Sequence, residues 1–362
     1  QIINPYTLRT RPIAGNLPPS RDRADRKPCR HVNYYILSAA YAQSFAYICV
    51  YLPQVGTDLI GASPYNNGEQ TQIGIGEALW DMLPAGRQIG GAPANFAYHM
   101  SQFGYDATAV SAVGLDAAGD DLVAQLDKRG LNHMMQRVAH PTGTVEVTLN
   151  NAGVPQYDIR RNVAWDFIPL TQELMRMAAQ CRCVCFGSLA QRSEVSRTTI
   201  TTLLDAMPAE ALKVFDINLR QNYYDRAVIE ASLRRCRILK INDEETHVVS
   251  RIFALGIDDE QQICLHLKRL FDLQAVILTC GTNGSHVIHD DGISTLLTPR
   301  VEVADTVGAG DSFTAGFAAI LAGCTLRHAH EVAVATSAYV CTQHGAMPRL
   351  PRQITDMIND NL

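Results

Sequence analysis

From residue 72 onward, short apolar runs alternate with longer segments in which apolar residues recur every three or four positions. The short runs predict strands at 73–78, 108–113, 184–187, 214–217, 238–241 and 276–279. The longer segments predict helices at 93–103, 117–129, 194–207, 243–253, 260–271 and 327–341. This alternation is typical of a mainly parallel sheet that is covered on both faces, so we expect a three-layer α/β/α core.

Residues 143–160 depart from this alternation. Residues 144–149 and 156–159 alternate in polarity around a turn at 150–153, which predicts a β-hairpin with no helix after it. On pattern alone, the hairpin could form an edge of the core sheet.

The first 70 residues differ in composition from the remainder. Residues 1–32 hold seven Arg or Lys against two Asp, and no Lys or Arg occurs between Arg30 and Arg87. The uncharged stretch 34–53 has the length of a membrane helix, but its tyrosines, serines and glutamine make it only moderately apolar. We therefore expect residues 1–70 to be a poorly ordered extension of a domain at 71–362. A membrane tether is the alternative.

Composition narrows the function classes. A chain of 362 residues with 47% hydrophobic content can bury a large core, and its formal charge of -5 gives no general attraction to nucleic acid or anionic membranes. The ten cysteines include no CxxC pair of the kind that binds zinc. We expect reduced, buried thiols in a cytoplasmic enzyme.

The strongest chemical signal is the run D-T-V-G-A-G-D-S-F at residues 305–313. Gly308 and Gly310 leave backbone N–H groups free to converge on an anion at the start of a helix. That helix is predicted by an apolar stripe at Phe313, Phe317, Ile320 and Leu321. Asp311 could accept a proton from a hydroxyl that attacks a bound phosphate, or it could simply cap the helix.

This run resembles the C-terminal signature of the ribokinase-type (PfkB) carbohydrate kinases. Residues 90–97 (GGAPANFA) and 111–120 resemble the N-terminal signature of that family, in the right order. Within the family, residues 76–81 and 216–220 look most like fructokinases. Together these segments span most of residues 72–351.

The resemblance implies a ribokinase-like core with a small β-lid, which the hairpin near 143–160 would help to form. It also implies ATP-dependent transfer of the γ-phosphoryl group to a sugar hydroxyl, with fructose as the leading substrate and fructose 6-phosphate as the product. Ribose, ketodeoxygluconate and adenosine are alternative substrates. A non-catalytic sugar-binding sensor is the alternative from another class. Partners would be sugar and ATP, with a homodimer through the lid.

Site residues follow from the same resemblance. Asp311 would be the catalytic base, and the turn at Gly308, Ala309 and Gly310 would form the anion hole. The sugar would meet four residues, namely Asp81, which we expect at the end of the first strand, Gly90, Gly91 and Asn95.

The nucleotide and its ions would lie on the other side of the cleft. Nucleotide contacts are expected at Asn218, Thr279, Gly281 and Gly284, although a plain hairpin turn would also use the two glycines. Asn242 and Glu245 would hold Mg²⁺ through water, or would form only a capping box; both can hold at once. Asp305 and Val307 would belong to a monovalent-cation site for K⁺.

Overall fold

The structure is a computed structural model that describes residues 71–83, 86–149, 155–321 and 324–358. The extension expected at 1–70, including the uncharged stretch 34–53, lies outside the described residues. Within the described part of the chain, no helix combines the length and apolar character needed to cross a membrane.

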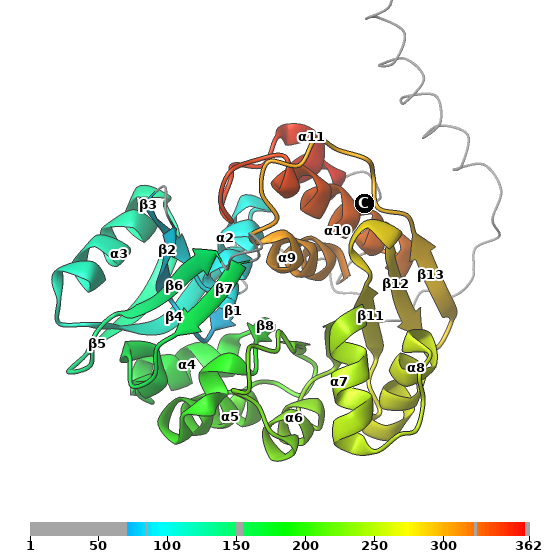
Figure 1. The fold of residues 1–362 in the computed structure, drawn as a ribbon, viewed down its shortest axis with the longest axis horizontal. Helices are drawn as coiled ribbons and strands as arrows, with labels where there is room; N and C mark the ends of the chain where they lie inside the picture. Colours follow the sequence, from blue (N-terminus) through cyan, green and yellow to red (C-terminus); the bar gives the residue numbers. More distant parts are fainter. Residues whose placement is uncertain (1–70, 84–85, 150–154, 322–323, 359–362) are drawn as a thin grey trace, which may run out of the picture. The chain divides into compact units, whose positions relative to one another are not determined.

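A nine-stranded sheet forms the centre of the described structure (Figure 1). Its strands run in the order β13 (Gly292–Leu296), β12 (Ser285–His289), β11 (Ala275–Thr279), β10 (Ile238–Asn242), β9 (Leu212–Asp216), β8 (Cys183–Phe186), β1 (Thr71–Ile75), β4 (Asp106–Gly114) and β5 (Asn132–Val138). All neighbours from β11 to β5 are parallel, and β12 and β13 add an antiparallel edge. The carboxyl ends of the parallel strands therefore meet at one edge of the sheet.

Helices cover both faces of this sheet. One face packs against α2 (Ala92–Gln102), α3 (Ala117–Lys128), α9 (Ala309–Leu321) and α10 (Leu326–Cys341). The other packs against α4 (Gln172–Gln180), α5 (Glu194–Ala206), α6 (Arg226–Leu233), α7 (Asp243–Phe253) and α8 (Glu260–Phe271). Short helices complete the chain at η1 (Ala164–Phe167), η2 (Leu189–Arg192), η3 (Gly281–Asn283), α11 (Arg352–Thr355) and η4 (Asp356–Ile358). The expected three-layer α/β/α core is confirmed.

The alternating direction of strand side chains creates the two cores. Along β8, Cys183 and Cys185 enter one core, whereas Val184 and Phe186 enter the other. Cys181 lies before the strand and joins the opposite core. The eight described cysteines are free thiols; five of them are buried as expected, whereas Cys280, Cys324 and Cys341 are half-buried.

A second, four-stranded sheet has the order β3 (Gly86–Gly90), β2 (Leu79–Leu83), β6 (Gly143–Leu149) and β7 (Pro155–Ile159). Strand β2 pairs parallel with β6, and the β2–β3 and β6–β7 pairs are antiparallel. The predicted hairpin is therefore confirmed, but the alternative of an edge hairpin on the core sheet is wrong. The bounds predicted for the first strand, 73–78, are also wrong. Strand β1 ends at Ile75, and the chain then enters the second sheet at β2.

Candidate active site

The candidate base lies inside the first turn of α9. Asp311 is the third residue of that helix, so it does not hold the N-cap position, which precedes the first helical residue. Its Oδ2 accepts a hydrogen bond of 2.7 Å from Nδ2 of Asn95 on α2. Burial, with the nearby Asp216 carboxylate, raises the pKa of Asp311 to about 7, while the Asn95 hydrogen bond, Lys240 and Arg220 act in the opposite direction. The carboxyl group thus titrates near neutral pH.

The turn before Asp311 has glycine at two positions where a side chain would meet a neighbouring group. Gly308 has a φ of 78°, and a Cβ atom there would lie 2.6 Å from the Cβ of Ala346. A Cβ atom on Gly310 would lie 2.8 Å from Nζ of Lys240. The two glycines allow α9 to begin in close contact with a neighbouring loop and with a buried cation.

Asp305 ties this turn to the loop that contains Ala346. Its Oδ1 accepts the Val307 N–H at 3.0 Å, and its Oδ2 accepts the Gly345 N–H at 3.1 Å. Asp305 and Val307, expected at a cation site, are therefore close together. The described residues contain no group of three or more His, Cys, Asp or Glu side chains arranged to hold a metal ion.

Asp81 occupies the middle of β2 in the second sheet, not the end of the first core strand as expected. Burial raises its pKa to about 6; Arg220 lowers this pKa and Asp305 raises it. A Cβ atom on Gly90, in the adjacent strand β3, would lie 2.2 Å from Oδ2 of Asp81. Arg220 lowers the pKa of both Asp81 and Asp311, so its positive charge favours the ionised form of both carboxyl groups.

Gly91 turns the chain from β3 into α2, which carries Asn95. It has a φ of 123°, and a Cβ atom there would lie 2.3 Å from the carbonyl oxygen of Glu77. This glycine therefore lets β3 and the start of α2 pass close to the segment that joins the two sheets. The predicted sugar-side residues lie close together, and Asp81 alone stands on a different element than expected.

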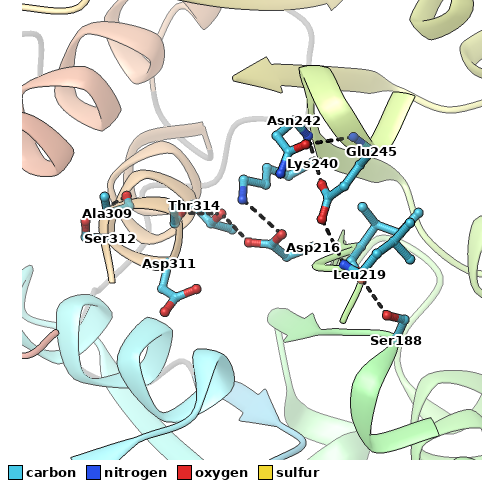
Figure 2. A network of polar contacts seen from close by, with 12 residues as sticks. Ser188, Asp216, Leu219, Lys240, Asn242, Glu245, Ala309, Asp311, Ser312 and Thr314 are labelled. Atoms are coloured by element: carbon cyan, nitrogen blue, oxygen red, sulfur yellow. Dashed lines mark hydrogen bonds and ion pairs between the residues drawn. The ribbon is translucent and has the colours of Figure 1, made fainter. Parts of the chain in front are cut away.

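Asn242 and Glu245 form the capping box at the junction of β10 and α7 (Figure 2). Asn242 Oδ1 accepts the Glu245 N–H at 2.8 Å, and Glu245 Oε2 accepts the Asn242 N–H at 2.9 Å. Glu245 Oε1 also accepts the Leu219 N–H at 2.8 Å, so the carboxylate joins α7 to the loop after β9. The capping-box reading is confirmed. Asn218, in that same loop, adopts a φ of 41°.

The predicted nucleotide loop connects β11 to β12. Cys280 donates its N–H to the carbonyl of Gly284 at 2.9 Å, and Gly281 and Gly284 have φ values of 52° and 110°. The hairpin-turn reading of these glycines is therefore confirmed. Thr279 ends β11 opposite Asn242 on β10, so this loop opens beside the capping box.

Sequence reasoning missed a buried ion pair beneath α9. Lys240, which is 8% exposed, places Nζ 3.1 Å from Oδ1 of Asp216 on the adjacent strand (Figure 2). The available signal was a lysine inside the apolar run 238–241, because a buried cation requires a partner. The partner could not be found in the same way, since nothing in the local pattern pairs β10 with β9.

Comparisons with known proteins show the family of this chain. The family model described as pfkB family carbohydrate kinase matches residues 85–353. A fructokinase of Klebsiella pneumoniae is 30% identical over 298 residues, covering 76% of this chain and 95% of the relative. An ATP-dependent 6-phosphofructokinase of Thermoanaerobacterium thermosaccharolyticum is 28% identical over 298 residues, covering 76% of this chain and 89% of the relative.

Solved structures share the fold. Fructokinase with bound ATP from Xylella fastidiosa superposes with a TM-score of 0.69 at 21% identity, covering 81% of this chain and 99% of that one. Ribokinase from Thermotoga maritima superposes with a TM-score of 0.65 at 20% identity, covering 80% of this chain and 99% of that one. The nine-stranded sheet with a smaller second sheet is thus a ribokinase-like α/β fold.

Proposed function

This chain belongs to the pfkB family of carbohydrate kinases, which transfer a phosphoryl group to a sugar hydroxyl, and we propose that it uses ATP to convert fructose to fructose 6-phosphate. The observation that carries the proposal is the contact between Asn95 and Asp311 at the start of α9. It holds a carboxylate beside the Gly308–Gly310 turn, where backbone N–H groups can bind an anion. Fructokinase relatives support the choice of sugar.

In the proposed reaction, Asp311 accepts the proton of the terminal sugar hydroxyl as that oxygen attacks phosphorus. Asn95 orients the carboxylate, and the N–H groups of Gly308, Ala309 and Gly310 stabilise charge on the transferred group. Because the base must be ionised, and the pKa of Asp311 is about 7, turnover should fall as the pH drops below neutrality. Asp81 is proposed to accept hydrogen bonds from sugar hydroxyls, with Gly90 and Gly91 keeping the space beside it open.

Nucleotide contacts are proposed on the β10–β12 side of the site, at Asn218, Thr279, Gly281 and Gly284. Each carboxylate oxygen of Glu245 accepts one backbone N–H group and keeps a further lone pair, so with Asn242 it would accept hydrogen bonds from the waters around a hydrated Mg²⁺. The ion would neutralise phosphate charge. Asp305 keeps further lone pairs beside its two N–H donors, which suits a weakly bound K⁺ near Val307.

We further propose that residues 71–362 form the kinase domain, with the second sheet acting as a lid and as a homodimer contact. The hairpin β6–β7 is joined to the sugar-side strand β2, which supports a lid role because movement of one strand would carry the other. All eight cysteines in the described part of the chain are free thiols, which supports a reducing, cytoplasmic setting.

The central test replaces Asp311 with Asn, which preserves size and removes the proton acceptor. Turnover of fructose, measured by coupled ADP detection, should fall by roughly 10²- to 10⁴-fold with little change in melting temperature. Asp120→Asn is the matched control, since Asp120 is an exposed acid in the first turn of α3. It should leave turnover unchanged.

Near-native turnover in Asp311→Asn would remove Asp311 from the mechanism. A panel of fructose, ribose, ketodeoxygluconate, adenosine and fructose 6-phosphate, run with the unmodified protein, identifies the sugar. Calorimetric sugar binding without ADP formation from any member of the panel would instead support a sensor.

A further inference from the structure

The buried ion pair of Lys240 and Asp216 lies against the start of α9. Lys240 and Asp216 are register partners on the parallel strands β10 and β9, and both are almost fully buried. Nζ of Lys240 also lies directly against Gly310, since a Cβ atom there would be 2.8 Å away. The ammonium group therefore contacts the first turn of α9, one residue from Asp311.

Thr314 connects Asp216 to the same helix through a hydrogen bond. Its hydroxyl lies 3.1 Å from Oδ2 of Asp216 and 3.0 Å from the Gly310 carbonyl oxygen, so one hydrogen is shared between two acceptors. Dashed lines in Figure 2 join the Asp216 carboxylate to both Lys240 and Thr314. The pair thus cannot move away from α9 without breaking buried polar contacts.

A buried ion pair contributes little net stability to a fold. Removing two charges from water costs several kcal/mol for each ion, and well-packed apolar residues of similar volume often replace such pairs without loss. The contact with α9 therefore calls for an electrostatic explanation beyond packing.

Asp311 is faced by polar or charged groups from several elements. These are Asn95 on α2, Cys185 on β8, Asp216 on β9, Arg220 in the loop after β9, and Lys240 on β10. The Cys185 thiol is neutral, because burial raises its pKa well above the ordinary value. Asp216 favours the protonated form of Asp311, whereas Lys240 and Arg220 favour its ionised form.

We propose that Asp216 and Lys240 are positioning residues that place opposite charges beneath the first turn of α9 and so set when Asp311 can accept a proton. This inference rests on the proposed function of Asp311 as the base. Asp216 has two roles in it: it opposes ionisation of Asp311, and it holds the Lys240 ammonium against Gly310. Lys240 favours ionisation and adds positive charge at the helix start, where the transferred phosphoryl group would lie.

The test measures the pH dependence of kcat/KM for fructose at saturating MgATP in two single variants. The fall in kcat/KM on the low-pH side of the profile is called the acid limb. Asp216→Asn removes the anion and should move the acid limb to lower pH. Lys240 still has Glu245 and Asp311 as anionic neighbours in this variant. Lys240→Met removes the cation and should move the limb to higher pH. Each displacement should be about one pH unit, the lower end of what a nearby charge does to a carboxyl group.

Opposite displacements separate electrostatics from structure. If the pair only supports the fold, both variants lose stability and activity, and the acid limb stays in place. The double variant Asp216→Asn/Lys240→Met should return the limb toward that of the unmodified protein. It also leaves no unpaired charge, so it supplies the missing comparison if one single variant fails to fold.

The matched control is the buried pair of Arg192 and Asp166, with Nε 2.8 Å from Oδ1. Neither residue is among the groups that act on Asp311. Asp166→Asn should therefore reduce thermal stability without moving the acid limb.

The inference would be overturned if both variants moved the acid limb in the same direction, or if neither variant moved it. Asp311→Asn separates this failure from failure of the proposed function. If that variant loses turnover while the limbs do not move, Asp311 remains the base and only the role of the ion pair is wrong.

Discussion

Gly308→Ala probes the turn that begins α9, and its effect can be worked out from two contacts. A φ of 78° is left-handed, and an L-residue pays roughly 1–2 kcal/mol to adopt that conformation. The new Cβ atom would also lie 2.6 Å from Cβ and 2.7 Å from Cα of Ala346, an overlap typical of overpacked cores that cost roughly 1–3 kcal/mol. We expect a total loss of about 2–5 kcal/mol in the free energy of unfolding.

Two companion variants isolate these contributions. Ala346→Gly, combined with Gly308→Ala, removes the nearest clashing atom and should restore part of the stability, while the backbone strain remains. Gly310→Ala is the comparison without left-handed strain, because its Cβ atom would meet only Nζ of the buried, paired Lys240 at 2.8 Å. Alanine favours a helix over glycine by about 1 kcal/mol, which offsets part of the cost of displacing that ammonium group, so this variant should lose less stability than Gly308→Ala.

Thermal unfolding followed by circular dichroism measures the effect, and coupled ADP detection measures turnover. A loss of this size corresponds to a fall in Tm of roughly 4–10 °C for a domain of this length. We expect turnover to fall in Gly308→Ala at temperatures where the protein remains folded, because the turn carries the proposed anion-binding N–H groups. A free energy of unfolding within about 0.5 kcal/mol of the unmodified protein would refute the reasoning.

Three further predictions concern the ions, the second sheet and the N-terminal segment. Glu245→Gln should raise the Mg²⁺ concentration needed for half-maximal activity and leave sugar affinity unchanged, since Gln also completes a capping box; an unaltered Mg²⁺ dependence would leave only the capping role. Hydrogen exchange at 143–160 should slow when fructose and a non-hydrolysable ATP analogue are added, and unchanged exchange would argue against a lid. A protein that lacks residues 1–70 should be soluble and active, and loss of either property would show that these residues belong to the working domain.

Local patterns were sufficient to predict six of the nine strands of the core sheet, namely β1, β4, β8, β9, β10 and β11, and the turn at Gly308. Parallel strands in alternation with helices have a strong periodic signal, and the buried Phe313 and Phe317 confirm the apolar stripe of α9 as far as its side chains are described. Strand β5 was missed because it forms an edge with mixed burial and so lacks a clear alternation.

The position of Asp81 could not be predicted in this way. Only the pairing of β2 with β6, more than sixty residues later, shows that residues 79–83 leave the core sheet. The contact between Asn95 and Asp311 spans 216 positions and the one between Thr314 and Asp216 spans 98. Such contacts depend on the order of the strands in the sheet and on the connections between them, which the pattern of any one segment does not reveal.

The two carboxylates of the site work against the stability of the fold at neutral pH. Burial raises the pKa of Asp81 to about 6 and that of Asp311 to about 7, above their ordinary values. The folded state therefore binds protons more tightly than the unfolded state, and stability from this source decreases as the pH rises from about 4 through 7. Arg220 offsets part of this effect for both groups, and Lys240 does so for Asp311. A hydroxyl that donates a hydrogen bond to either carboxylate would also offset this effect, so the burial that lowers the stability of the fold favours binding of a polyhydroxylated substrate.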